Sequence, residues 1–404
     1  MILPPINQEP ARQSYDVVII GGAVMGSSVA WFLATNPDFD GHILVVERDP
    51  SYATASTTHT NSCIRQQFST EINLRISQFG VSFLKRFREE LGGDPEVPDI
   101  HLAPFGYMYL AGDAATADVL RRNQALQARC GVATRLMTPG EIAAEYPFYN
   151  LDGILLGSHN PRDEGYFDGT TMFHWWRRKA HALGVEYLTD EVIGIDTAGS
   201  RITGLRLGSG RAVSTGTVVN ASGPRAALIA GMAGLRLPVE PRKRFTFVFS
   251  AERPLEGVLP LTIDPSGVHV RSDGANYLCG CPPDDDIAVA PGDFKMDHAI
   301  WEAKVWPALA HRIPAFEAIR QVNSWAGHYA YNTLDQNAVI GRHPDLDGFI
   351  FVNGFSGHGL QQAPAMGRGV SELIIYGRYQ GLDLSPLGYE RILTSSPLCE
   401  DAII

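Results

Sequence analysis

The chain of 404 residues is 45% hydrophobic, which is typical of a soluble globular protein with roughly two to three domains' worth of sequence. Its formal net charge is −11 at pH 7, and no segment gathers lysine and arginine into a stripe, so a nucleic acid or an anionic membrane is not expected as a partner. The one short basic cluster, Arg242 to Arg244, is interpreted as the solvated start of a strand.

The N-terminal segment MILPPINQEPARQSYD lacks the basic region and apolar run of a secretory signal, and the first apolar run is far shorter than the roughly 20 residues of a membrane span. Five cysteines are scattered along the chain, and none forms a C-x-x-C pair. Cys279 and Cys281 share a face of a predicted strand, but one Cys-x-Cys is a weak signal for a metal. We therefore expect a cytoplasmic protein without a membrane span or a metal site.

The N-terminal region has the pattern of a strand, a turn, a helix and a second strand. Residues 16–20 form a short strand pattern whose apolar run, residues 17–20, ends at glycine, and residues 24–34 repeat apolar side chains at helical spacing. A second apolar run, residues 43–46, ends at Glu47. In this context a glycine motif of the form G-x-G-x-x-G binds the pyrophosphate of a dinucleotide at the start of the helix.

The motif itself departs from the pattern, because "GGAVMG" has Ala23 at the middle glycine position. Gly21 and Gly26 meet the need for a tight turn and for close packing of the helix, and Gly22 keeps the loop permissive. A methyl group is the smallest possible departure. We expect the loop to bind a pyrophosphate and Glu47 to accept hydrogen bonds from ribose hydroxyls.

The central part of the chain changes character twice. From about residue 95 to 150, strands with proline and glycine surround a polar helix near residues 114–130. Residues 184–224 return to short β-runs, the last of which, "TVVNASG", ends in another glycine turn. Residues 236–280 alternate as strands, and a helix is predicted near residues 296–310.

The run Phe349–Val352 ends in a third glycine turn, "GFSGHG", and a helix follows. The three strand-to-glycine turns, near residues 21, 223 and 354, predict one nucleotide-binding domain assembled from separated pieces, with a second domain inserted between them. NAD and FAD both use the first motif. A reduced flavin carries negative charge that a second helix N-terminus at "GFSGHG" would stabilise, but the turn is also consistent with a loop that only reverses the chain.

Taken together, the sequence resembles the FAD-dependent amine oxidoreductases of the D-amino acid oxidase family, and within it the monomeric sarcosine oxidases and dimethylglycine dehydrogenase-like secondary-amine enzymes. The resemblance covers nearly the whole chain and rests on "DVVIIGGAVMGSSVAWFLA", "VVERDPSYATASTTHTNSCIRQQFS", "VVNASGPRAA", "NTLDQNAVIGRHP" and "FVNGFSGHGLQQAPAMG". The last two motifs are specific to this family, whereas the first is generic.

The expected fold class is α/β plus α+β: an FAD-binding Rossmann-like domain assembled from discontinuous segments, with an inserted antiparallel-sheet substrate domain. Residues 1–95, 150–235 and 325–395 are assigned to the FAD-binding domain. Residues 96–149 and 236–324 are assigned to the substrate-binding domain.

The resemblance implies a set of FAD contacts. The adenosine diphosphate half would contact Gly21, Gly22, Ala23, Val24, Met25, Gly26, Glu47 and Arg48, with Ser56 and Thr57 at the pyrophosphate. Val192 would contact adenine, and Ala221 and Gly223 match the second glycine turn. The isoalloxazine would lie beside Asn61, Ser62, His328, Tyr329, Phe355, Gly357, His358, Gly359, Leu360 and Gln361.

The resemblance also implies substrate contacts. Arg65 matches the arginine that holds the substrate carboxylate, a task that suits a guanidinium fork. His269 and Arg271 alternate along a predicted strand and could suit a second carboxylate. The expected reaction is oxidation of a secondary amine that bears a carboxylate, or of a related N-substituted glycine, with sarcosine, dimethylglycine and iminodiacetate as the candidate types.

Three positions depart from the family pattern. The cysteine that links FAD in sarcosine oxidases is matched by His328, so we expect non-covalent FAD. A lysine at the substrate carboxylate is matched by Gln361, and "NYLCGC" lacks the lysine that assists reaction with oxygen. Without that lysine the sequence leaves two electron acceptors open, namely oxygen, as in an oxidase, and another acceptor, as in a dehydrogenase. The alternatives are an FAD-containing dehydrogenase or assembly-type protein without oxidase activity, and an NAD-dependent dehydrogenase.

Overall fold

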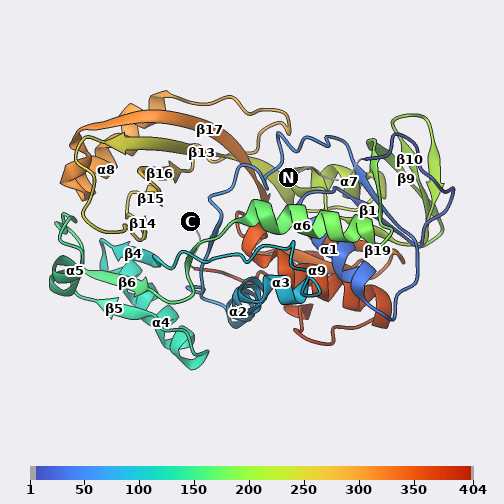
Figure 1. The fold of residues 1–404 in the computed structure, drawn as a ribbon, viewed down its shortest axis with the longest axis horizontal. Coiled ribbons are helices and arrows are strands. Elements are labelled where there is room, and N and C mark those ends of the chain that lie inside the picture. Colours follow the sequence, from blue (N-terminus) through green and yellow to red (C-terminus); the bar gives the residue numbers. More distant parts are fainter. Residues whose placement is uncertain (1–5, 402–404) are drawn as a thin grey trace.

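The computed structural model describes residues 6–401 and contains two large β-sheets, which lie toward opposite ends of the long axis in Figure 1. The first sheet has six strands in the order β18-β19-β12-β1-β2-β8, and only the β18–β19 pair is antiparallel. Its strands are β1 (Val17–Ile20), β2 (Ile43–Glu47), β8 (Glu186–Thr189), β12 (Val218–Asn220), β18 (Val339–Arg342) and β19 (Phe349–Asn353).

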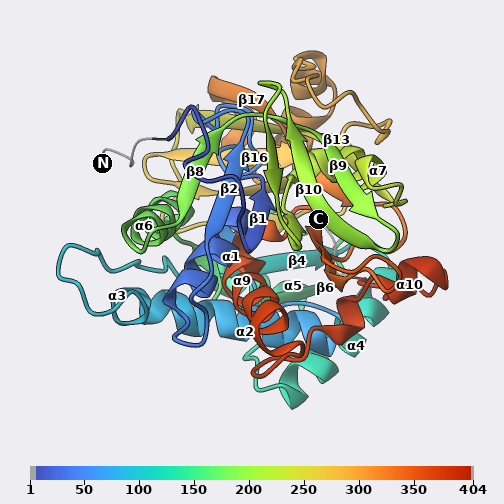
Figure 2. The ribbon, with the colours of Figure 1, turned by 90° about the vertical axis from the view of Figure 1, so that its right-hand side faces the viewer.

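This sheet is covered on both faces, which is why its strands are short continuous apolar runs. Val17 and Ile19 of β1 pack in one core with helices α1 (Val24–Thr35), α6 (Gly169–Ala182) and α9 (Gly359–Tyr376). Val18 and Ile20 pack in a second core on the opposite face. The elements of that core are β9 (Val192–Ala198), β10 (Arg201–Leu207), β11 (Ala212–Ser214) and α7 (Ala226–Met232). Figure 2 shows α1 and α9 on one side of β1 and the strands β9 and β10 on the other.

The three predicted strand-to-glycine turns meet at one edge of this sheet. Strands β1, β12 and β19 are neighbours and run parallel, with Ile20 opposite Asn220 and Asn220 opposite Phe351. Because parallel strands end at the same edge, the turns near residues 21, 223 and 354 converge there. The sequence therefore predicted correctly that these separated segments build one structure.

The second sheet has eight strands in the order β17-β13-β16-β15-β14-β4-β6-β5 and is antiparallel except between β14 and β4. Its strands are β4 (Tyr107–Ala111), β5 (Arg135–Met137), β6 (Leu156–Asn160), β13 (Val239–Ala251), β14 (Leu261–Ile263), β15 (His269–Asp273), β16 (Asn276–Cys281) and β17 (Ile319–Asn332). Figure 1 shows the long strands β13 and β17 reaching from this sheet toward the six-stranded sheet.

Shorter elements complete the fold. The helices are α2 (Glu71–Lys85), α3 (Phe87–Glu90), α4 (Ala114–Arg129), α5 (Pro139–Glu145), α8 (Trp306–Arg312) and α10 (Glu390–Leu393), and β3 (Cys63–Ile64) pairs with β7 (Gly165–Tyr166). Single helical turns are η1 (Gly223–Arg225), η2 (Trp301–Val305, a π-helix), η3 (Pro314–Glu317) and η4 (Ser385–Leu387). Between residues 6 and 401 no helix combines the length and apolar character required to cross a membrane.

The strand pairing bears on the predicted domain boundaries. The boundary at residue 150 assigns β6 to the FAD-binding part, yet β6 pairs with β4 and β5 in the eight-stranded sheet. The boundary at residue 325 falls inside β17, which pairs along its whole length with β13. The division into two domains stays a prediction, and the pairing favours placing its boundaries after residue 160 and before residue 319.

Candidate active site

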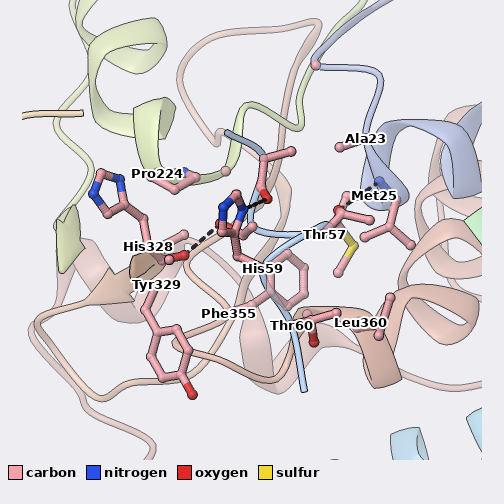
Figure 3. Close-up of a pocket in the computed structure, with 18 of the residues that line it drawn as sticks. Ala23, Met25, Thr57, His59, Thr60, Pro224, His328, Tyr329, Phe355 and Leu360 are labelled. Atoms are coloured by element: carbon pink, nitrogen blue, oxygen red, sulfur yellow. Dashed lines mark hydrogen bonds between the residues drawn. The ribbon is translucent and has the colours of Figure 1, made fainter. Parts of the chain in front are cut away.

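A cavity extends from the carboxyl edge of the six-stranded sheet to the eight-stranded sheet. Its lining includes the starts of α1 and α9, the end of β2, the turn after β12 and parts of β13, β15 and β17. Figure 3 looks into it, with Ala23 and Met25 on one side and His328 and Tyr329 on the other. In open parallel sheets, ligands bind at this position, outside the carboxyl ends of the strands.

Most residues predicted to bind cofactor or substrate line this cavity. They are Gly21, Ala23, Val24, Met25, Glu47, Arg48, Ser56, Thr57, Asn61, Arg65, Val192, Ala221, Gly223, His269, His328, Tyr329, Phe355, Gly357, His358, Gly359, Leu360 and Gln361. The cavity lining does not include Gly22, Gly26, Ser62 or Arg271. The backbone N–H of Gly22 donates to Glu47, and Gly26 packs against the carbonyl of Gly21. The carbonyl of Ser62 accepts the backbone N–H of Phe167.

The start of α1 presents backbone donors to the cavity. Its N-cap residue, Ala23, makes no side-chain cap bond, the hydroxyl of Thr57 accepts the N–H of Val24 at 3.3 Å, and in the described part of the chain no acidic residue lies in the first turn. The N–H groups at a helix start and the helix dipole both favour an anion. Ala23 has a φ of −69°, an ordinary value for alanine, so the missing glycine imposes no strain on the turn.

Glu47 stands beside this helix start, at the end of β2. Its side chain is only 8% exposed, and its two oxygens accept the backbone N–H groups of Gly22 at 2.9 Å and Asp49 at 2.8 Å. Burial raises the pKa of this carboxyl group. Each carboxylate oxygen has a second lone pair, so Glu47 can also accept hydroxyl donors from the cavity.

The start of α9 presents a second set of donors. Its N-cap residue is His358, and again the structure from residue 6 to 401 shows no side-chain cap and no acid in the first turn. The preceding Gly357 has a φ of +96°, and a Cβ there would lie 2.5 Å from the Tyr329 ring. Two helix starts without an acidic residue in the first turn and a strand-end glutamate around one cavity fit a dinucleotide whose redox ring becomes negatively charged on reduction.

Arg65, which follows β3, is the most buried cation of the cavity lining, with 1% exposure. Its guanidinium donates to the carbonyl of Gln67 at 2.8 Å and to the hydroxyl of Tyr109, and it stacks on Phe68 with 4.2 Å between Cζ and the ring centroid. The backbone N–H of Arg65 donates to Oε1 of Gln361 at 2.9 Å. These contacts fix a planar cation against the wall of the cavity.

His358 links Arg65 to the start of α9. Its Nε2 lies 2.8 Å from a terminal nitrogen of Arg65, and because a guanidinium has only donors, this nitrogen of the ring accepts. Burial, followed by the charge of Arg65, holds the pKa of His358 well below its usual range. His358 is therefore neutral, and the positive charge at this point belongs to Arg65.

The structure separates His269 from Arg271, which the sequence placed together as a candidate site for a second carboxylate. His269 lines the cavity, and the side-chain amide of Asn61 donates to its Nε2 at 3.0 Å. Burial lowers the pKa of His269 to about 4, so it is neutral near pH 7. Arg271 lies outside the cavity lining and donates to Asp273 at 2.9 Å and to the carbonyl of Asn61 at 3.1 Å.

His328 is a packed histidine on β17. Its Nε2 lies 2.7 Å from the carbonyl oxygen of Asp293, and its ring stacks on Phe294 with 4.1 Å between centroids. Its backbone carbonyl accepts the hydroxyl of Ser56 at 2.6 Å. In Figure 3 the side chains of His328 and Tyr329 project in different directions from the same strand.

The basic cluster on β13 is only partly exposed and its cations are paired, contrary to the sequence interpretation of a solvated strand start. Arg244 lines the cavity, lies over the Tyr329 ring at 4.6 Å, and binds Asp286 through two bonds of 2.7 and 2.9 Å. Lys243 pairs with Asp293 at 2.8 Å, and Arg242 lies over the Tyr331 ring. The acidic loop that supplies these partners is far from the cluster in sequence, so no local signal indicated the pairing.

Other residues of the lining were not singled out by the sequence. They include Tyr52, His59, Thr60, Tyr107 and Arg225. His59 and Thr60 adjoin the predicted contacts Ser56, Thr57 and Asn61, so extending that motif would have found them. Tyr107 carried no comparable signal, because an aromatic residue on a strand more often belongs to a core.

No lysine is present among the cavity-lining residues within 6–401. On β16, Cys279 and Cys281 pack into the hydrophobic core, while a Cβ at Gly280 would lie 2.7 Å from the carbonyl of Phe245 and 2.9 Å from the ring of His269. His269 thus occupies the space that a long side chain from this strand would need. The same described residues contain no cluster of three histidine, cysteine or acidic side chains able to hold a metal.

The cavity and its helix starts place the chain in the dinucleotide-binding α/β class. The chain belongs to the FAD dependent oxidoreductase family, whose model matches residues 16–373. It is 38% identical over 434 residues to FAD-dependent oxidoreductase domain-containing protein 1 of Xenopus laevis, covering 99% of this chain and 87% of that protein. It is 24% identical to mitochondrial sarcosine dehydrogenase of Homo sapiens, covering 92% of this chain and 41% of that protein. The solved structure of L-proline dehydrogenase from P. horikoshii superposes with a TM-score of 0.81 at 28% identity, covering 95% of this chain and 98% of that one.

These similarities confirm the predicted family, the fold class and an FAD-dependent enzyme. FAD is the cofactor, which sets aside the alternative of an NAD-dependent dehydrogenase. The contacts predicted for individual residues, and the non-covalent binding of FAD, stay predictions.

Proposed function

We propose that the chain oxidises a secondary amine that bears a carboxylate, either an N-substituted glycine or a cyclic amino acid of the proline type. The observation that carries this proposal is the buried cation Arg65 in the wall of the cavity. A guanidinium grips a carboxylate with two parallel hydrogen bonds and keeps its charge when buried. The names of a sarcosine dehydrogenase and an L-proline dehydrogenase among similar proteins favour the same substrate class.

The protein's part in this reaction is orientation and electrostatics. Arg65 would bind the carboxylate, and the neutral rings of His269 and His358 would leave the amine free to bind uncharged. The start of α9 would favour negative charge on the cofactor. FAD, when bound, would supply the hydride acceptor for the carbon next to the nitrogen. Hydrolysis of the released imine by water would give an amine and a carbonyl compound from an N-substituted glycine, and one ring-opened amino-carbonyl compound from a cyclic amino acid.

We further propose that the electron acceptor is not oxygen. The cavity lining holds no lysine among the described residues, and the space beside Gly280 on β16 is filled by His269. We also propose that FAD is bound non-covalently. The ring of His328, which stands where sarcosine oxidases have the linking cysteine, is already held by Phe294 and by the carbonyl of Asp293.

Anaerobic mixing of the purified holoenzyme with sarcosine, dimethylglycine, N-methyl amino acids and proline tests the reaction. We expect at least one of them to bleach the flavin absorbance. Admitting air should restore the colour at least about 10-fold more slowly than adding a dye acceptor. If no secondary amine bleaches the flavin, the enzymatic proposal fails and a structural role for FAD, as in an assembly protein, gains support.

Substrates with a second carboxylate are expected to be poor. Within the cavity lining, Arg244 is already bound by Asp286 and His269 is neutral, whereas Arg271 lies outside the lining and is bound by Asp273. A second buried carboxylate would lose its hydration without gaining a cation, so kcat/KM for iminodiacetate should fall at least about 10-fold below that of the best monocarboxylate. Equal values for the two compounds would contradict this account of the cavity.

A further inference from the structure

A buried glutamate lies behind Arg65, outside the cavity lining. Glu164 immediately precedes β7 and has no solvent exposure. One of its oxygens accepts the backbone N–H groups of Gln66 at 2.6 Å and Gln67 at 2.9 Å, and the other accepts the side-chain amide of Gln67 at 3.0 Å. Three donors from two adjacent residues converge on this single carboxylate.

These bonds lead directly to the guanidinium of Arg65. The backbone N–H of Gln67 donates to Glu164, and the backbone carbonyl of Gln67 accepts a hydrogen bond of 2.8 Å from a terminal nitrogen of Arg65. The Gln67 side chain is held at both ends, since its amide nitrogen also donates to the carbonyl of Tyr107 at 3.1 Å and its oxygen accepts the hydroxyl of Ser158 at 2.8 Å. Glu164 therefore fixes the backbone that orients the guanidinium, and the Gln67 side chain ties this backbone to strands β4 and β6.

The charge of Glu164 matters as well as its geometry. Burial raises its pKa to about 7, and the bonds from Gln67 and Gln66 and the charge of Arg65 act in the opposite direction. The charged and titratable groups that face it are Arg65 and the phenols Tyr107 and Tyr109. A buried cation at a substrate site is less costly when a carboxylate lies nearby.

We propose that Glu164 is a positioning residue for the substrate carboxylate, acting through Gln67 to hold the guanidinium of Arg65 in its binding orientation. This inference rests on the proposed function, because it takes Arg65 as the carboxylate-binding group. It assigns a role to a residue that does not touch the cavity. It also explains why the loop after β3 and the segment before β7 are joined by buried polar bonds.

Positioning and simple charge have opposite consequences for ligand binding. Above pH 7, where Glu164 is ionised and where the titration is done, Glu164→Gln removes a negative charge near the site, so an electrostatic role alone predicts that a carboxylate binds more tightly. The new amide also faces the amide nitrogen of Gln67, donor against donor, and this disturbs the backbone that holds Arg65. Glu164→Asp keeps the charge but is one methylene too short to reach both Gln66 and Gln67.

The test is titration of the holoenzyme with acetate, followed by the change in flavin absorbance, with acetamide as the uncharged control ligand. We expect acetate to bind about 10-fold more weakly to Glu164→Gln and several-fold more weakly to Glu164→Asp, with the affinity for acetamide unchanged. Glu145→Gln, which removes an exposed glutamate paired with Arg135, should change neither ligand.

Tighter or unchanged acetate binding in both Glu164 variants would overturn the inference, as would equal loss of acetate and acetamide, which indicates general disruption. Glu164→Asp is the variant that keeps the test open if Glu164→Gln does not fold. Acetate bound by the wild-type enzyme but unaffected in the variants leaves the proposed function intact. A wild-type enzyme that binds neither acetate nor any amino acid would remove both proposals.

Discussion

Arg65→Met is expected to weaken acetate binding to the holoenzyme by about 100-fold, since the charge-assisted bonds of a buried guanidinium to a carboxylate are worth about 3 kcal/mol. Methionine has a similar length and is apolar, so the contact with the Phe68 ring can be kept while the charge is lost. The measurement is the same flavin titration, with the kcat/KM of any amine that bleaches the flavin as a second readout.

Two further variants serve as an intermediate case and a control for Arg65→Met. Arg65→Lys keeps the charge but cannot donate in parallel to the carbonyl of Gln67 and to His358, so its acetate affinity should lie between wild type and Arg65→Met. Arg135→Met removes an exposed arginine paired with Glu145 and should bind acetate like the wild type. Wild-type affinity in Arg65→Met would show that the carboxylate is held elsewhere, with Arg244 as the next cation to test.

Gly26→Ala is expected to abolish retention of FAD. A Cβ at residue 26 would lie 1.8 Å from the carbonyl oxygen of Gly21, a backbone atom in the turn that α1 must pack against. The helix can only accommodate the methyl group by moving away from the turn, which should destabilise the fold by about 3 kcal/mol and displace the N–H groups that favour the pyrophosphate. The measurements are the ratio of flavin to protein absorbance after purification and the thermal midpoint with added FAD.

The matched control is Ala23→Gly, which restores the three-glycine pattern at the middle position. Ala23 has an ordinary negative φ, so the substitution relieves no strain, and flavin content should equal that of the wild type. A yellow and equally stable Gly26→Ala protein would mean that α1 does not need its close contact with the turn. The two variants together separate the glycine that the turn requires from the one that it does not.

The nucleotide-binding part of the fold was accessible from the sequence. Apolar runs that end in glycine, followed by helical periodicity, predicted β1, α1, β2, β12, β19 and α9 close to their observed positions. These signals are local, because strand and helix periodicity and a turn's demand for glycine are encoded by neighbouring residues. The helix predicted near residues 296–310 is less regular in the structure than the sequence pattern indicated, because a π-helix over Trp301–Val305 precedes α8.

The inner surface of the site depended on contacts between distant residues. The sequence offered Arg271 as a candidate for a second carboxylate and interpreted Arg244 as solvated, whereas in the fold Arg271 donates to Asp273 outside the lining and Arg244 lines the cavity. Asp286, which decides the environment of Arg244, lies on a different segment and is brought near only by the eight-stranded sheet.

The sequence by itself determined the family, the cofactor and most of the segments that surround it, because each glycine turn and apolar run specifies its own backbone. Only the tertiary structure decided which charged side chains face the cavity and which are neutralised behind it. The alternation of residues along a strand predicts which side chains share a face. It does not predict which other elements pack against that face. Arg65 contacts Tyr109 and His358, Arg244 contacts Asp286, and Arg271 donates to the carbonyl of Asn61. All of these partners are distant in sequence, and they set the direction in which each guanidinium points.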